Sequence, residues 1–183
     1  MNNNVNEGKA ILCTTLEQIK AYNPCETSYK KLLKGLNKTK ADKEPLEFRT
    51  IYNILDADDL FWSTRVLNKK TRVYVGALFA DTVKHLTEDK RVHNCIEVCF
   101  RYARGEATEK ELKNAASAFA AFAADADASA AYAATYAAAD YAAYAAYSAY
   151  NATNAAYTAS DEDTYEDNKD KLALMFLTYI EEV

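Results

Sequence analysis

Residues 114–160 read NAASAFAAFAADADASAAYAATYAAADYAAYAAYSAYNATNAAYTAS, and this tract decides the fold. It holds twenty-five alanines, seven tyrosines and two phenylalanines, and it has no glycine, proline, lysine or arginine. Alanine has the highest intrinsic helix propensity, because it loses no side-chain entropy when it becomes helical. The last 78 residues contain neither glycine nor proline. The sequence therefore predicts an almost continuous helical structure from residue 106 onward.

The tract is too long for one straight helix in a compact domain. A single helix over residues 108–159 would extend roughly 78 Å at 1.5 Å per residue. We therefore expect a bend or turn at residues 125–129 or 151–154. Short polar side chains at these places compete for backbone hydrogen bonds.

Helix-end signals predict shorter helices on either side of the tract. Thr14-x-x-Glu17 and Thr108-x-x-Glu111 have the spacing of capping boxes, and the first helix is expected to start at Thr14 or Thr15. The other signals are Gly35 and Gly105 as helix ends, Pro45 as a first helical residue, and Asp56 and Thr87 as N-caps. A final helix should bury Leu172, Leu174, Met175, Leu177, Tyr179 and Ile180.

These elements predict an all-α protein, in which a bundle of short N-terminal helices packs against long Ala- and Tyr-rich C-terminal helices. The chain is expected to form one domain over residues 1–183. It would comprise a disordered tail at 1–9, a short-helix part at 10–105 and an Ala/Tyr-rich part at 106–183. No secretory signal and no strongly apolar span of membrane length stands in the sequence. We therefore expect a soluble, cytoplasmic protein without membrane contact.

Charge divides unevenly along the chain. Residues 1–105 carry eighteen Lys and Arg against thirteen Asp and Glu, whereas residues 106–183 carry four against fourteen. The two parts thus differ in sign, +5 against −10, within a net charge of −5. The halves either attract each other or offer separate charged faces, to solvent or to a partner.

The tyrosines of the tract are its candidate functional residues. They stand at positions 132, 136, 141, 144, 147, 150 and 157, and the alanines between them allow another helix to approach closely. One interpretation buries the rings in the bundle and leaves the hydroxyls at its rim. The other exposes them as an acidic, aromatic binding face, since tyrosine is prominent in interface hot spots. The residues of that predicted face are Tyr136, Asp140, Tyr144, Tyr147, Tyr150, Asp161, Glu162 and Asp163.

Patterns typical of reaction chemistry have structural explanations. Cys95 and Cys99, with His93 nearby, have a spacing that metal ligands also use, but the thiols stand among apolar residues and resemble core positions. Asp56, Asp58 and Asp59 are more simply a helix start than paired catalytic carboxylates. The lysines of residues 30–43 favour a solvated linker over a phosphate or nucleic-acid site. The four cysteines are expected to be free thiols, and we predict no metal, cofactor or enzymatic activity.

The region from Asp56 to about Tyr157 resembles an alanine-rich, immunity-protein-like family of bacteria and bacteriophages. The residues that carry the resemblance are 58–62 (DDLFW), 95–97 (CIE), 101–112 (RYARGEATEKEL) and the Ala/Tyr/Asp tract that follows. The resemblance implies a small helical protein, found in phages or beside toxin systems, that neutralises something by binding. It supplies no catalytic residues.

Three functions remain open from the sequence. The leading hypothesis is a non-enzymatic, phage-borne inhibitor or immunity-type protein that binds a toxin or an antiviral defence protein, for example of the CRISPR type, through the Tyr-rich face. A second is a sponge that sequesters a nucleotide messenger, because tyrosines stack on bases and lysines hold phosphates. A third is a structural homo-oligomer in which alanine faces pair between chains.

Overall fold

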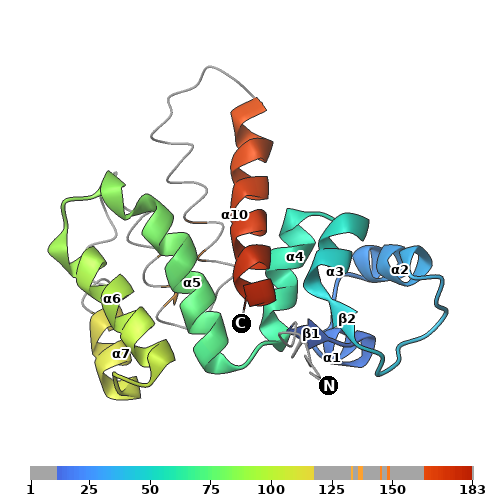
Figure 1. The fold of residues 1–183 in the computed structure, drawn as a ribbon, viewed down its shortest axis with the longest axis horizontal. Helices are drawn as coiled ribbons and strands as arrows, with labels where there is room; N and C mark the ends of the chain where they lie inside the picture. The colour runs from blue at the N-terminus through green and yellow to red at the C-terminus, as the bar shows by residue number, and fades with distance from the viewer. Residues whose placement is uncertain are drawn as a thin grey trace, which may run out of the picture.

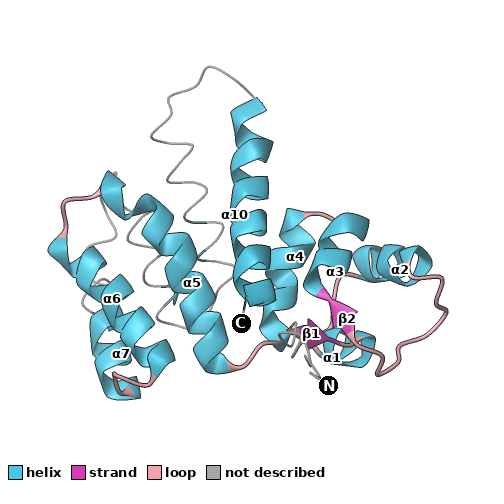
Figure 2. Cartoon of the chain, in the orientation of Figure 1, coloured by secondary structure: helices cyan, strands magenta, loops and turns pink. Residues whose placement is uncertain are grey.

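The computed structural model describes residues 12–117 and 163–182, together with residues 133, 136, 137, 145 and 148 between them. The predicted tail at 1–9 and the two predicted bends of the tract lie outside these residues. Nearly all described elements are helices, as Figure 2 shows, and the all-α prediction is confirmed.

The elements before residue 67 form one end of the molecule. In chain order they are β1 (Cys13–Thr14), α1 (Leu16–Ala21), α2 (Glu26–Gly35), β2 (Leu46–Glu47), α3 (Phe48–Ile54), α4 (Ala57–Ser63) and the 3-10 turn η1 (Thr64–Val66). The strands β1 and β2 pair antiparallel, with Cys13 opposite Glu47 and Thr14 opposite Leu46. This short pairing joins the two ends of the α1–α2 segment.

The following helices form the other end, and the C-terminal helix stands between the two ends (Figure 1). They are α5 (Lys69–Val83), the 3-10 turn η2 (Lys84–Leu86), α6 (Lys90–Arg104), α7 (Glu109–Ser117) and α10 (Asp163–Glu182). Helices α5, α6 and α7 pack in chain order, whereas α10 contacts α3, α4 and α5.

Polar caps define most of the helix starts. The side chains of Thr15, Asp56, Asn68 and Asp89 each accept a hydrogen bond from a backbone N–H of the first turn. The box predicted at Thr108 is confirmed: Thr108 N–H donates to Glu111 Oε2 at 2.7 Å, and Glu111 N–H donates to Thr108 Oγ1 at 3.2 Å.

Several predicted boundaries are wrong for local reasons. Of the two predicted starts of the first helix, Thr15 is confirmed as the N-cap of α1, and Thr14 is wrong because it belongs to β1. Pro45 precedes β2 and not a helix, because the chain first pairs with β1. Thr87 accepts a hydrogen bond from Asp89 N–H in the turn before α6, and Asp89 is the N-cap of that helix.

Gly35 and Gly105 have different structural roles. Gly105 ends α6 in the left-handed region, with φ 82°, as predicted for a helix terminus. Gly35 is instead the last residue of α2, and Asn37 takes the positive φ of 55°. A Cβ atom on Gly35 would lie 2.6 Å from Ile54 Cγ2, so glycine is needed there for the close approach of α2 and α3.

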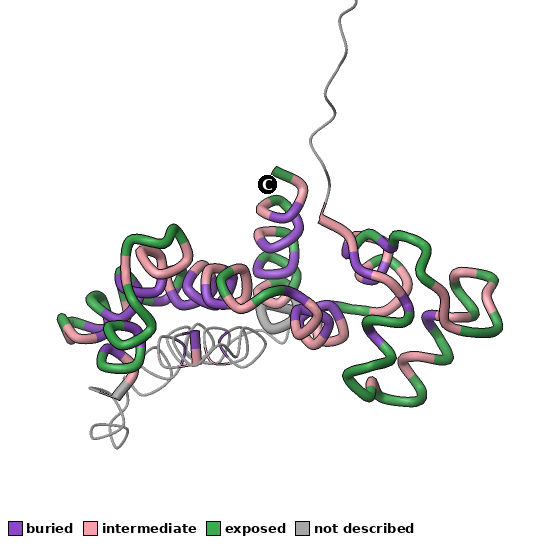
Figure 3. Tube along the Cα trace, turned by 90° about the horizontal axis from the view of Figure 1, so that it is seen from below, coloured by how far each residue is buried: buried purple, intermediate pink, exposed green. Residues whose placement is uncertain are grey.

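Buried residues from both ends of the molecule and from α10 form one hydrophobic cluster. Buried positions follow the inner sides of α5 and α10, while the α2–β2 connection is mostly exposed (Figure 3). Leu172, Leu177 and Ile180 are buried as predicted, but Leu174 is 46% exposed, and the prediction for it is wrong. Phe176 occupies the core position on that turn of α10. No helix within the described residues is long and apolar enough to cross a membrane.

Candidate functional site

The described positions of the alanine tract show which side of it faces the core. Ala133, Ala137 and Ala145 are helical and completely buried. Tyr136 is helical and half-buried, and its ring packs against the hydrophobic cluster. Ser148 is helical and half-buried as well. The completely buried positions at 133, 137 and 145 are thus all alanines, whose small side chains allow close approach of the packed elements, and Tyr136 contacts the core from a half-buried position.

The residues of the predicted binding face are only partly within the described structure. Tyr136 is in place as a half-buried ring on the core, and Asp163 is the first residue of α10. Asp140, Tyr144, Tyr147, Tyr150, Asp161 and Glu162 lie outside the described residues. The described part of the site is thus the set of contacts that hold α10 against α3, α4 and α5. We call these contacts the support.

Aromatic rings anchor α10 in that support. Phe176 is fully buried and meets Phe48 of α3 edge-on, with ring centroids 5.6 Å apart. Its ring also lies 6.4 Å from the ring of Phe79 of α5. One turn later Tyr179 stacks on Tyr74 of α5, with centroids 4.6 Å apart. The C-terminal helix is therefore fixed between both ends of the molecule by side chains that bury large apolar area.

Polar contacts at the edges of the same helix complete its placement. Arg49 of α3 makes a two-pronged contact with Glu181, and its Nη2 lies 2.8 Å from Glu181 Oε2. The hydrogen bond with Glu181 raises the pKa of Arg49, and the one with Arg49 lowers the pKa of Glu181. Both side chains are more than a third exposed, so solvent screens the pair and its stabilisation is small.

Two further contacts join the other half of α10 to α3 and α4. Tyr52 Oη donates to Asp170 Oδ1 at 2.7 Å, and burial, followed by that hydrogen bond, raises the pKa of Tyr52 to about 12. Lys169 Nζ lies 3.0 Å from Asp58 Oδ2, with only 14% of the lysine side chain exposed. Among these contacts of α10, Arg49–Glu181 joins a basic residue of the N-terminal part to an acidic residue of the C-terminal part, whereas Asp58–Lys169 has the opposite arrangement, so the described pairs do not decide between the two interpretations of the charge division.

The metal-like cysteine pair is part of the core. Cys95 and Cys99 are buried free thiols, and a hydrogen bond with Cys95 and burial raise the pKa of Cys99. His93 is exposed, and its Nε2 lies 3.0 Å from the Thr87 carbonyl oxygen and 3.1 Å from that of Lys84. No group of His, Cys, Asp and Glu side chains in the described part of the chain is arranged to hold a metal ion.

The other charged motifs also have structural roles. Asp56 caps α4, with Oδ1 accepting from Asp59 N–H at 2.9 Å, which confirms the interpretation of this motif as a helix start. Lys38 lies 2.6 Å from Asp42 and 2.7 Å from Glu44, and the hydrogen bond with Asp42 is the main cause of its raised pKa. The basic linker is therefore partly neutralised by its own acidic residues.

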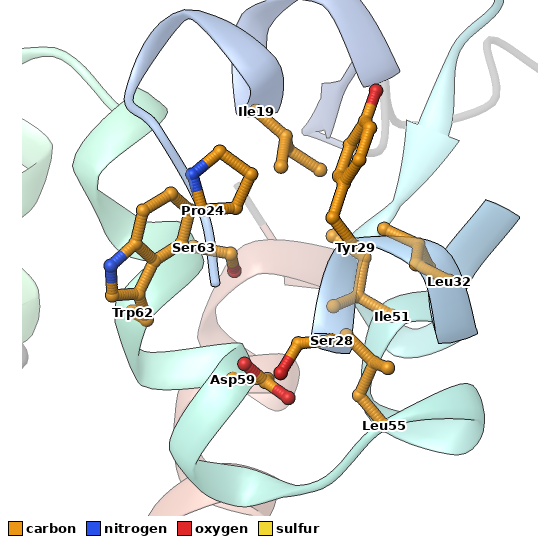
Figure 4. Close-up of a pocket in the computed structure, with 10 residues that line it drawn as sticks. All are labelled: Ile19, Pro24, Ser28, Tyr29, Leu32, Ile51, Leu55, Asp59, Trp62 and Ser63. Atoms are coloured by element: carbon orange, nitrogen blue, oxygen red, sulfur yellow. The ribbon is translucent and has the colours of Figure 1, made fainter. Parts of the chain in front are cut away.

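A pocket between α2, α3 and α4 was not anticipated from the sequence. Its lining comes from Pro24 before α2, from three helices and from Ile19 of α1, and Asp59 and Ser28 face each other within it (Figure 4). Its residues come from three separate stretches of the chain, 19–32, 51–55 and 59–63, so no local sequence motif indicates the pocket.

No family model, curated protein or solved structure matches this chain. The resemblance to alanine-rich, immunity-type proteins remains a prediction from the residues quoted above.

Proposed function

We propose that this protein is a non-enzymatic inhibitor of the immunity type, which binds a toxin or an antiviral defence protein directly through the Tyr-rich face of its alanine tract. The observation that carries the proposal is the complete burial of Ala133, Ala137 and Ala145. A tract that packs through its methyl groups has its larger side chains available at other positions around the helix.

Helix geometry assigns the tyrosines of the proposed face. At about 100° per residue, Tyr136 stands about 100° from Ala137, on a flank, which agrees with its half-buried ring. On the helical period predicted from the sequence, Tyr147 and Tyr150 would follow the buried Ala145 by about 200° and 140°, and we propose that they face away from the core. On the same predicted period, Tyr144 would stand about 100° from Ala145, the same rotation that separates Tyr136 from Ala137.

The chemistry of this face favours a basic protein partner. Tyrosine contributes large contact area for little lost side-chain entropy, and buried aromatic residues dominate many interfaces. Asp140 and the acidic residues at 161–163 are four of the fourteen acidic residues of a C-terminal part with a net charge of −10. Opposite charge on the partner would accelerate the encounter and orient the complex.

The test uses the full chain as bait in a host-cell lysate. Wild type is compared with the triple variant Tyr144→Ala, Tyr147→Ala, Tyr150→Ala and with Tyr22→Ala as matched control, because Tyr22 is an exposed tyrosine outside the tract. We expect a protein to be retained by wild type and by the control but lost by the triple variant, at unchanged helicity. The retained protein, once purified, should lose its own activity when the wild-type chain is added.

Equal retention by all three chains would overturn the assignment of the face, and an active retained protein would overturn the inhibitory function. Two measurements address the other hypotheses. Mass spectrometry of molecules released from the purified protein would detect a sequestered nucleotide, and light scattering would detect an oligomer held together by alanine faces. Either finding, together with failure to retain a partner, would replace the proposal.

A further inference from the structure

The pocket beside α4 has a shape and a chemistry suited to one kind of group. The space inside it is about 20 Å³, which is enough for one water-sized group. Most of the lining is apolar, and it includes Pro24, Leu55 and Trp62. In Figure 4 the Trp62 indole lies beside Pro24 at one side of the opening. The guanidinium of Arg65 lies 5.2 Å from the Trp62 ring centroid and helps to hold the indole in place.

Two hydroxyl groups of the pocket lining donate hydrogen bonds to backbone carbonyls, and one side chain of the lining is a carboxylate. Tyr29 Oη donates to the Leu16 carbonyl at 3.2 Å, and Ser63 Oγ donates to the Leu60 carbonyl at 2.6 Å. Asp59 is the carboxylate of the pocket, and Ser28 is its hydrogen-bonding neighbour. Within the described part of the chain Asp59 forms no ion pair.

The surroundings of Asp59 leave its charge incompletely compensated. Burial raises the pKa of Asp59, and the charges of Asp56 and Asp58 raise it further, whereas Ser28 and Lys31 lower it. Lys31 is exposed and does not line the pocket. The neighbouring acids already have roles, since Asp56 caps α4 and Asp58 pairs with Lys169. A cation of the right size placed in the pocket would therefore gain from Asp59 in a partly desolvated setting.

We propose that this pocket receives a lysine side chain of a partner protein, with the ammonium group at Asp59 and the aliphatic stem along Leu55, Pro24 and Trp62. An ammonium group is about the size of one water molecule and fits this space, and it is a compact point charge, whereas a guanidinium is larger and planar. The aliphatic stem of a lysine can cover apolar surface while its ammonium group stays in polar surroundings. The carboxylate excludes an anion. This site shares no residue with the Tyr-rich face, so its test is independent of the test of the proposed function.

The pocket carries its own reporter, because Trp62 is the only tryptophan of the chain. Its fluorescence is followed while n-butylammonium is added to the full-length protein at constant ionic strength. n-Butanol supplies the same stem without the charge, and n-butylguanidinium supplies the larger cation. We expect saturable binding of n-butylammonium, and binding of the other two compounds about tenfold weaker or undetectable. Equal responses to all three would overturn the proposal.

Variants test the role of the carboxylate. Asp59→Asn should weaken n-butylammonium binding about tenfold, because the charge is lost at nearly constant shape. Ser28→Ala is the matched control, since it changes the same corner of the pocket and keeps the carboxylate, and it should retain binding. An unchanged affinity of Asp59→Asn would contradict the site. Methyl NMR of the wild-type protein gives a measurement that needs no variant: ligand-induced shifts should gather at Ile19, Leu32 and Ile51, and shifts elsewhere alone would overturn the proposal.

A last comparison separates a protein lysine from a free amine. N-acetyl-lysine N-methylamide carries the ammonium and the stem on a peptide backbone, and the corresponding norleucine compound lacks the ammonium. We expect the lysine compound to bind at least as well as n-butylammonium and the norleucine compound not to bind. Binding of the free amine without binding of the lysine compound would contradict a protein partner.

Discussion

Helices α6 and α10 are held in place in different ways. α6 has an Asp89 cap at one end and Gly105 at the other, and it packs on α5 and α7, which precede and follow it in the chain. α10 depends on distant residues: its polar contacts join Arg49 to Glu181, Tyr52 to Asp170, and Asp58 to Lys169, across 132, 118 and 111 positions. Local sequence signals define α6, whereas long-range packing defines the position of α10. This matters for function, because the proposed binding face comes directly before α10 in the chain.

Among the variants that test this difference, Phe176→Ala is expected to have the largest effect on stability. Removing a fully buried ring that contacts Phe48 and Phe79 should lower the free energy of unfolding by about 3–5 kcal/mol. Urea unfolding followed by circular dichroism measures the change. Leu174→Ala is the matched control on the same helix, since Leu174 is 46% exposed, and it should cost less than about 0.5 kcal/mol. Similar costs for the two variants would mean that α10 is not anchored through this ring.

The sequence predicts the locally defined features better than the long-range ones. The helical class, the Thr108 capping box, the Asp56 cap and the Gly105 terminus depend on neighbouring residues, and all are confirmed. The β1–β2 pairing was missed, because two-residue strands have no periodic pattern and depend on a partner about thirty residues away. Helical spacing alone did not distinguish Leu174 from Phe176 on α10, because the choice of face depends on α3 and α5.

The candidate sites follow the same division. Alanine spacing anticipated a tract that packs closely, and the buried Ala133, Ala137 and Ala145 agree with it. The pocket at Asp59 could not be found from the sequence, because its walls come from the α1–α2 segment, α3 and α4. Asp59 was interpreted as part of a helix start, and that interpretation holds for its backbone while its side chain faces Ser28.

Gly35→Ala probes packing between neighbouring helices. The new Cβ would lie 2.6 Å from Cγ2 of the β-branched Ile54, and such overpacking typically costs about 1–3 kcal/mol. Thermal or urea unfolding should show a net loss near the lower end, since alanine also favours the helix by about 1 kcal/mol. In an Ile54→Ala background the obstacle is absent, so the same substitution should become stabilising. A loss of equal size in both backgrounds would show that the contact with Ile54 is not its cause.

Gly105→Ala tests the helix end of α6, which depends on the backbone conformation of this one residue. The nearest atom to a new Cβ is Lys70 Nζ at 3.4 Å, so the cost comes from the positive φ of 82° and should be about 1–2 kcal/mol. Gly105→Asn should cost less, because asparagine tolerates this conformation better. Equilibrium unfolding of the two variants decides the point, and an alanine variant as stable as wild type would contradict the assigned backbone strain.

The smallest expected effect is that of Glu181→Gln. The pair with Arg49 is largely solvent-exposed, so the loss at about pH 7 should not exceed about 1 kcal/mol. The folded state lowers the pKa of Glu181, and the stabilisation is therefore present above the unfolded pKa, about 4.3, and is lost as the pH falls through the folded value. Unfolding of wild type and variant should differ at about pH 7 and coincide at about pH 2. A difference that persists in acid would have another origin.

The central claim, that the tract packs through alanine and offers its tyrosines to a partner, is tested most directly by chemical nitration of the free protein. Peptide mass spectrometry after tetranitromethane treatment gives a rate for each tyrosine. Tyr22, 45% exposed, is the accessible reference, and Tyr29, half-buried with its hydroxyl donated to the Leu16 carbonyl, is the protected one. We predict that Tyr147 and Tyr150 react as fast as Tyr22. Rates as slow as that of Tyr29 would mean that these rings are covered by the protein itself, which would contradict the binding face.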